Sequence, residues 1–145
     1  MIRTLETDNA PKPLSAYAQG IEIPPGHRVV HVSGQVGVAL DGQIPADPAR
    51  QHELAWENAL AVLAAAGMDH TNIVDAHCYI TERAHLGIYR ATRDRFLKGH
   101  RPAATLLIVA GLADERLVVE VDLVAAAEAA GRPHEATPPE WVSGA

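Results

Sequence analysis

The 145-residue sequence contains a single cysteine and no long apolar run, and each absence excludes a class of protein. Because Cys78 is alone, no disulfide can form within the chain, and a reducing cytoplasm is the expected compartment. No apolar segment reaches the roughly 18–20 residues that cross a bilayer. The first residues, MIRTLETDNAPKP, also lack the apolar stretch of a signal peptide. We therefore expect a cytoplasmic protein without a membrane partner.

Basic residues and metal-binding spacings are scarce as well. The chain has 12 Lys and Arg residues against 18 Asp and Glu residues, a formal net charge of −6, and no basic run. This balance argues against a nucleic-acid partner, although one or two arginines suffice to hold a small anion. The eight histidines show neither HxH nor HExxH spacing, so we expect no metal site.

Aromatic residues make up only 4% of the chain and hydrophobic residues 48%, so the core must consist mainly of Ala, Val, Leu and Ile. The length suits one domain, which we place at residues 1–130. Turn residues and apolar periodicity divide it in the order ββαβαββ. The expected strands are 17–23, 28–33 and 73–80, the helices are 47–66 and 85–98, and 101–124 holds the closing strands. This order predicts an α+β fold in which a mixed sheet carries two helices on one face.

The two expected helices have defined ends and buried stripes. Asp47 is a good N-cap for the first helix, and Gly67 is a typical C-terminal stop. Its inward residues are expected to be Trp56, Leu60 and Leu63. In the second helix the expected inward residues are Leu86, Tyr89 and Phe96, and the expected outward ones are Arg93, Asp94 and Arg95.

Residues 101–124, RPAATLLIVAGLADERLVVEVDLV, hold two apolar runs around a short charged turn, which predicts a β-hairpin. Alternate side chains of a strand share a face, so Glu120 and Asp122 point the same way. The strands are apolar on both faces, and helices can cover only one. Another copy of the chain is the simplest cover for the second face, so an oligomer is predicted. We expect the Pro-rich tail, 131–145, to lie over the surface or over a neighbouring subunit, with Trp141 as an anchor.

Several segments, in a fixed order, resemble one known family. They are SAYAQG (15–20), HVSGQVG (31–37), QHELAWENALAVLAAAG (51–67), IVDAHCYITE (73–82), RPAATLLIVAGLA (101–113) and LVVEVDLVAAA (117–127). Together these resemble the RidA/YjgF reactive-intermediate deaminases, many of which carry the older label L-PSP endoribonuclease. The resemblance implies a chorismate-mutase-like fold, a homotrimer with a central barrel, and ligand clefts between subunits. It also implies hydrolysis of small enamines or imines to 2-oxo acids and ammonia, without a cofactor.

One position departs from the family pattern. In the deaminating members an arginine after Pro-Ala clamps the substrate carboxylate, whereas here Ala104 follows Pro102-Ala103. Either the chain serves a different substrate, or another arginine takes over the clamp. Arg101 lies three residues earlier, so an ideal strand points it to the opposite face, and we expect a solvated charge. Arg90 matches a polar helix position that borders the cleft and is the better replacement.

The resemblance also implies roles for individual residues. Asp122 matches the catalytic carboxylate that positions water and proton at the imine, and its alternative role is a structural ion pair. For Glu120 we favour an ion pair with an arginine across a subunit boundary. Tyr17 matches a cleft-edge hydroxyl but is equally suited to interface packing, and Ser33-Gly34 matches a segment whose backbone contacts the ligand. The substrate-binding residues are thus expected to be Tyr17, Ser33, Gly34, Arg90, Ala104, Leu106 and Glu120. Cys78 is expected to be a buried, inert thiol.

Three classes of function remain open from the sequence. The first is a cofactor-free hydrolase of small imines or enamines. The second, motivated by Ala104, is a trimer that binds a small metabolite such as a carboxylate without turnover. The third is a ribonuclease, which only the older family label suggests and the net charge of −6 argues against.

Overall fold

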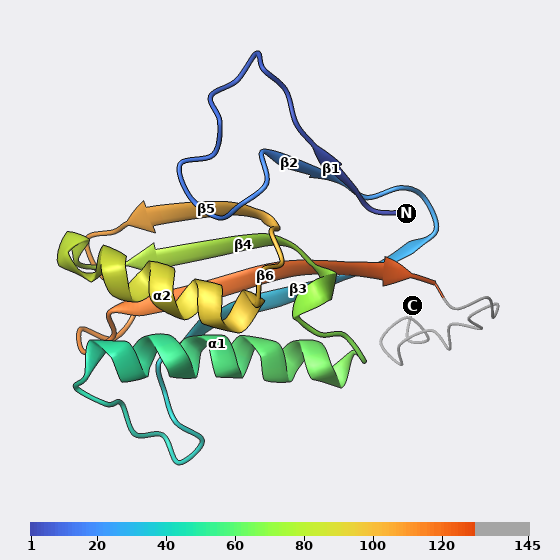
Figure 1. The fold of residues 1–145 in the computed structure, drawn as a ribbon. Coiled ribbons are helices and arrows are strands. Elements are labelled where there is room, and N and C mark those ends of the chain that lie inside the picture. The colour runs from blue at the N-terminus through green and yellow to red at the C-terminus, as the bar shows by residue number, and fades with distance from the viewer. Residues whose placement is uncertain (130–145) are drawn as a thin grey trace, which may run out of the picture.

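The computed structural model describes residues 1–129, in which a four-stranded sheet carries both α-helices on one face (Figure 1). The strands are β1 (Arg3–Leu5), β2 (Gly20–Glu22), β3 (His27–Val36), β4 (Ile73–Ile80), β5 (Ala103–Ile108) and β6 (Val119–Glu128). The helices are α1 (Pro48–Ala65) and α2 (Leu86–Leu97), with the short 3₁₀ turns η1 (His70–Asn72) and η2 (Arg83–His85). The predicted α+β architecture is confirmed, and the predicted tail with its Trp141 anchor lies outside the described residues.

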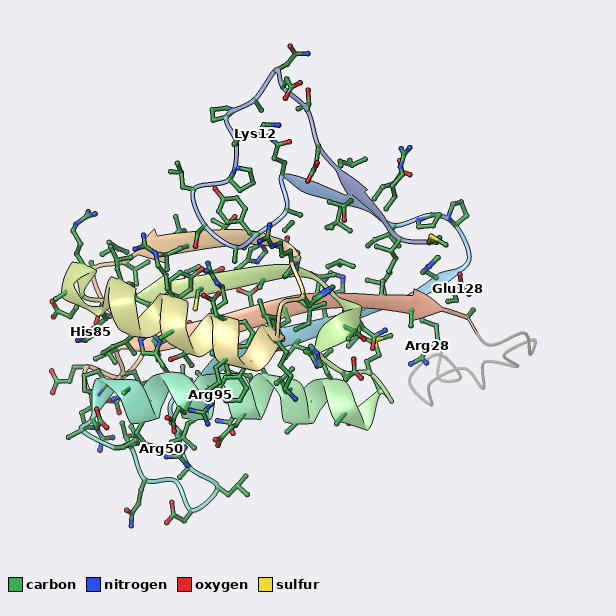
Figure 2. The ribbon with its side chains drawn as sticks, viewed as in Figure 1. Lys12, Arg28, Arg50, His85, Arg95 and Glu128 are labelled. Atoms are coloured by element: carbon green, nitrogen blue, oxygen red, sulfur yellow. The ribbon has the colours of Figure 1, made fainter. Side chains whose placement is uncertain are left out.

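Helix α1 begins and ends where the sequence predicts, because local groups satisfy both of its ends. Asp47 Oδ1 accepts a hydrogen bond from Ala49 N at 3.1 Å. At the other end Gly67 adopts a φ of +71°, which glycine takes without strain. Arg28 Nη2, from β3, donates to the Ala66 carbonyl at 2.9 Å. The end of α1 is thereby tied to the sheet. Figure 2 labels Arg28 among the side chains of the sheet. In residues 1–129, no helix has both the length and the apolarity to cross a membrane.

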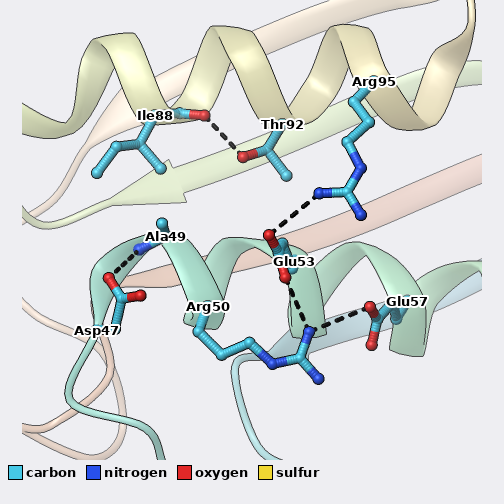
Figure 3. Close-up of polar contacts among 8 residues, drawn as sticks. All are labelled: Asp47, Ala49, Arg50, Glu53, Glu57, Ile88, Thr92 and Arg95. Atoms are coloured by element: carbon cyan, nitrogen blue, oxygen red, sulfur yellow. Dashed lines mark hydrogen bonds and ion pairs between the residues drawn. The ribbon is translucent and has the colours of Figure 1, made fainter.

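Helices α1 and α2 meet through a stacked aromatic pair and a surface ion pair. The rings of Trp56 and Phe96 stack with their centroids 6.3 Å apart. Arg95 Nη1 reaches from α2 to Glu53 Oε1 on α1 at 3.1 Å, and Arg50 Nη1 donates to the other oxygen of Glu53 at 2.9 Å (Figure 3). Exposed ion pairs contribute only about 0–1 kcal/mol, so the aromatic contact is the stronger of these two interactions.

The sheet order is β3-β6-β4-β5, and the predicted hairpin at 101–124 is wrong. β5 pairs in parallel with β4, whereas β6 lies antiparallel between β4 and β3. The physical reason is the connection through α2, which returns the chain to the start of β4 and makes β5 parallel to it. Residues 109–118 then carry the chain across to the other edge of β4. Both strands of the expected hairpin exist, but β4 separates them.

The pairing near the N-terminus also differs from the expected pair of strands at 17–23 and 28–33. β2 pairs antiparallel with β1, a strand that was not predicted, and β3 pairs with β6. Pro24-Pro25 removes two backbone donors, so a ladder cannot continue across this turn. The segment before β2 instead runs along β5, where Ala18 N donates to the Pro102 carbonyl at 2.9 Å. This contact brings residues 14–17 beside β5.

The two faces of the sheet differ in burial, as β6 shows. Val119, Val121 and Leu123 are at most 1% exposed beneath the helices, whereas Glu120 and Asp122 lie on the other face and are half-buried. β4 alternates in the same way, with Asp75, His77 and Tyr79 on the face away from the helices. Within residues 1–129 no helix covers this second face, which we call the open face. The one-sided placement of the helices agrees with the sequence prediction.

The buried amide of Gln51 links α1 to two loops. Its Nε2 donates to the carbonyls of Pro45 at 2.9 Å and Arg116 at 2.8 Å, and its Oε1 accepts from Val118 N at 2.9 Å. Gly37 packs directly against this residue, and a Cβ added to Gly37 would lie 2.6 Å from the Gln51 Cα. Since that Cα belongs to the backbone of α1, the neighbour cannot move aside without shifting the helix.

We predict that Gly37→Ala lowers the free energy of unfolding by about 1–3 kcal/mol, the usual effect of overpacking a filled core. Urea denaturation followed by circular dichroism measures the change. Gly87→Ala is the matched control, because a Cβ at Gly87 in α2 meets no atom within 4 Å and should leave stability equal or slightly higher. Equal stability of the wild type and Gly37→Ala would contradict the packing described here.

Candidate functional site

A pocket of about 240 Å³ lies between β5, α2 and the segment before β2. Its eight lining residues are Leu14, Ser15, Tyr17, Tyr89, Arg90, Arg93, Ala104 and Leu106. Four of the substrate-binding residues expected from the sequence, Tyr17, Arg90, Ala104 and Leu106, therefore lie together. Ala104 and Leu106 pair with Ala76 and Cys78, so they point to the helix side of the sheet. Arg101 is exposed and does not line this pocket.

Four of the lining residues were not predicted for the site, namely Leu14, Ser15, Tyr89 and Arg93. For Arg93 the predicted outward position is wrong. Its side chain is only 3% exposed. Arg93 Nη2 donates to Ser15 Oγ at 2.7 Å, its Nε donates to Asp94 Oδ1 at 3.0 Å, and its Nη1 contacts the Tyr89 hydroxyl at 3.4 Å. Tyr89, Arg93 and Leu97 are spaced by four along α2, which places them on one inward stripe. This spacing indicates that Arg93 faces inward, although a charged residue is usually expected on the outer face of a helix.

The charges of the pocket are positive. Burial opposes the charge on Arg93, but hydrogen bonds with Tyr89 and Asp94 outweigh it, and the Arg93 pKa is raised. Burial raises the pKa of the Tyr89 hydroxyl, although its contact with Arg93 acts in the opposite direction. Arg90 adds an exposed guanidinium at the rim, and none of the eight lining residues is acidic. The pocket therefore suits an anionic group.

The predicted catalytic residue, Asp122, lies on the open face and is bound to a histidine. His77 Nδ1 lies 2.7 Å from Asp122 Oδ1, and His77 Nε2 lies 2.8 Å from Asp75 Oδ2. A carboxylate at each ring nitrogen favours the protonated imidazolium, in which both nitrogens donate. Burial acts to lower the His77 pKa, but the two aspartates outweigh it and the pKa is raised. The Asp75-x-His77 alternation on one strand is the signal that sequence reasoning overlooked.

The other expected residues of the open face lie beside this cluster. Tyr79 is the cross-strand neighbour of Glu120. A hydrogen bond with Asp122 raises the pKa of the Tyr79 hydroxyl. A Cβ on Gly34 would come within 2.8 Å of Glu120 Cδ, so the glycine makes room for that carboxylate. Within residues 1–129 Glu120 forms no ion pair, and its pairing with an arginine of another subunit stays a prediction.

The residues predicted to form one site thus fall into two groups on opposite faces of the sheet. Tyr17, Arg90, Ala104 and Leu106 line the pocket on the helix side, whereas Ser33, Gly34, Glu120 and Asp122 lie on or beside the open face. Alternation along the strands fixes this separation, because neighbouring side chains point to opposite faces. Within one chain a small ligand cannot contact both groups.

Two further titratable side chains are buried in the core. Cys78 is 3% exposed, so its predicted burial is confirmed, and burial raises its pKa to about 12. Its lack of reactivity stays a prediction. His52 is fully buried, and neither of its ring nitrogens has a hydrogen-bond partner among the described residues. Burial, with a smaller effect of His85, lowers the His52 pKa to about 4. No group of three or more His, Cys, Asp or Glu in residues 1–129 is arranged to hold a metal ion.

Known proteins resemble this chain over most of its length. A sequence profile of the endoribonuclease L-PSP family matches residues 7–127. The 2-iminobutanoate/2-iminopropanoate deaminase of Escherichia coli K12 is 30% identical over 129 residues, which cover 86% of this chain and 98% of the deaminase. The structure of E. coli TdcF with bound serine has a TM-score of 0.66 at 28% identity and covers 87% of this chain and 99% of its own. YyfB of Yersinia pestis, a Rid-family protein, shares the fold with a TM-score of 0.76 at 23% identity, covering 86% and 97% of the two chains.

We predict that His77 titrates above the ordinary histidine pKa of roughly 6.5. Asp122→Asn should lower that value, because it removes an ionised acceptor, whereas Asp41→Asn in the distant loop before α1 should not. NMR titration of the imidazole Cε1–H measures both. Since folding raises this pKa, the stabilisation by the cluster is present below about pH 6.5 and is lost as the pH rises through the folded-state value. A His77 pKa below that of free histidine would contradict the doubly hydrogen-bonded imidazolium.

Proposed function

The chain belongs to the endoribonuclease L-PSP family, which includes the Rid and YjgF proteins, and from that premise we propose that it hydrolyses small imines or enamines in the cytoplasm. The products are a 2-oxo acid and ammonia. The observation that carries the proposal is that the chain has both a donor-lined pocket at β5 and a carboxylate, Asp122, on the open face. The name of the E. coli deaminase supports the same class of substrate.

The proposed catalytic unit is a cleft between two copies of the chain in a homotrimer whose sheets enclose a central barrel. Asp122 and Ser33-Gly34 of one copy face the β5 pocket of the next. Two observations support this assembly: the two groups of site residues lie on opposite faces, and the open face exposes apolar side chains. Val29 is 46% exposed and Leu107 49% exposed on that face, a pattern typical of an interface.

The proposed chemistry requires only proton transfers and a positioned water. Protonation of the imine nitrogen makes the imine carbon electrophilic, and water adds to that carbon while Asp122 accepts its proton. Asp122 then returns the proton to the nitrogen, and as the carbon–nitrogen bond breaks it takes the proton of the new hydroxyl, so that the carbonyl forms as ammonia leaves. Release of that last proton to solvent balances the proton that solvent gave to the imine nitrogen. No electrons are gained or lost, so the reaction needs no redox cofactor. His77 holds one Asp122 oxygen at 2.7 Å and so fixes the orientation of the carboxylate.

A second candidate is a non-catalytic trimer that binds a small metabolite at the same cleft. Ala104 favours it, because the position after Pro102-Ala103 holds no guanidinium. Saturable binding without product formation would support this candidate over hydrolysis. Ribonuclease activity remains the least supported function, since the net charge is −6 and the chain has no basic run.

We predict that the full-length protein accelerates ammonia release from freshly generated 2-iminobutanoate above the rate in buffer. Asp122→Ala should remove about 10²-fold or more of the acceleration, the usual contribution of a positioned general base. Continuous detection of ammonia with a coupled dehydrogenase measures the rate.

Glu115→Ala serves as the matched control, because it removes the same charge from an exposed position far from both groups of site residues. Decay of several small imines at the buffer rate in the presence of folded protein would overturn the proposal. Unchanged activity of Asp122→Ala would overturn the role of that residue.

A further inference from the structure

We infer that Arg93 is the specificity-determining residue of the β5 pocket and binds the carboxylate of a small ligand there. This inference deepens the proposed function, because it names the ligand class and the anchoring group, but the binding itself requires no turnover. The hydrogen-bond donors of the pocket, its charge and its size support this role.

The buried guanidinium of Arg93 has unused hydrogen-bonding capacity. Arginine carries five N–H donors and no acceptor. In Arg93 the Nε group and the Nη2 group are occupied by Asp94 and Ser15. Nη1 makes only the long 3.4 Å contact with the Tyr89 hydroxyl, so at least one of its two N–H groups has no partner among the described residues. A buried donor without a partner is costly, and a ligand oxygen would satisfy it.

The three hydroxyl side chains that line the pocket are free to donate. The hydroxyls of Ser15 and Tyr89 accept from Arg93, and the Tyr17 hydroxyl accepts from Leu14 N at 3.3 Å. A hydroxyl that accepts within the chain keeps its own proton for another acceptor. The pocket therefore offers N–H and O–H donors from α2 and the 14–17 segment, which is the arrangement that recognises an oxygen anion.

Charge and size narrow the ligand further. Among residues 1–129 Asp94 is the only acid bonded to Arg93, and it offsets that charge from outside the lining with 55% of its side chain exposed. Arg90 at the rim still gives the pocket a net positive charge. The β5 wall, Ala104 and Leu106, contributes no polar group. The pocket has a volume of about 240 Å³, which leaves room for a small ligand. These dimensions fit a short aliphatic acid whose carboxylate binds Arg93 and whose chain packs on β5.

The test is isothermal titration calorimetry with 2-oxobutanoate, a stable compound that carries the carboxylate without the reactive imine. Arg93→Met should weaken its binding by about 10–100-fold, the usual loss for a charge-assisted hydrogen bond. Tyr89→Phe, which removes one hydroxyl only, should weaken it by about 2–10-fold. Arg95→Gln is the matched control, because Arg95 lies on the same helix but pairs with Glu53 of α1, and its affinity should equal that of the wild type.

Two further ligands test whether the pocket selects a carboxylate over a neutral amide or a phosphate. The neutral 2-oxobutanamide should bind at least 10-fold more weakly than 2-oxobutanoate, and inorganic phosphate should compete only at much higher concentration. Tighter binding of phosphate than of the 2-oxo acid would overturn the assignment to a carboxylate. Equal affinity of Arg93→Met and the wild type, or no binding by the wild type, would overturn the role of Arg93.

Failure of this inference can be distinguished from failure of the proposed function. Arg93-dependent binding of 2-oxobutanoate without hydrolysis of any imine would support the inference and refute the hydrolase. Hydrolysis with an unchanged KM in Arg93→Met would do the reverse. If circular dichroism shows that Arg93→Met does not fold, Arg93→Lys, which keeps the charge but loses the planar fork, and Tyr89→Phe decide the question by the same affinity measurement.

Discussion

The placement of β6 between β3 and β4, with both helices on one side of the sheet, is the constraint on which the rest of the structure depends. It buries Val119, Val121 and Leu123 and turns Glu120 and Asp122 to the opposite face. The same geometry leaves α2 and β5 to form the pocket on the helix side. A single chain therefore presents basic donors on one side and carboxylates on the other, and a reaction that needs both requires a second copy.

The elements that depend on local sequence were predictable, and the pairings that depend on distant sequence were not. Asp47 and Gly67 mark the ends of α1, and β4 follows the expected range, because caps and periodicity act within a few residues. The apolar runs at 103–108 and 119–124 fit several neighbours equally well. The connection through α2 places β5 parallel to β4, and no local pattern in either apolar run predicts this pairing.

The candidate site shows the same division between local and distant information. The sequence resemblance identified Asp122 and Ala104, whereas the partners that define their surroundings were missed. Arg93 is separated from Ser15 by 78 positions, and His77 from Asp122 by 45, so only the folded chain brings these groups together. A charged residue on a helix is normally solvated, and its burial becomes favourable only where such partners satisfy it.

The fully buried His52 makes the stability of the core depend on pH. Its pKa of about 4 lies below the 6.5 of an ordinary histidine because burial disfavours the charged ring. Between these values the unfolded chain binds more protons than the folded one, so stability falls as the pH drops from about 6.5 toward 4. Because His52 belongs to α1, protonation of this one buried ring as the pH falls opposes the packing of that helix against the core.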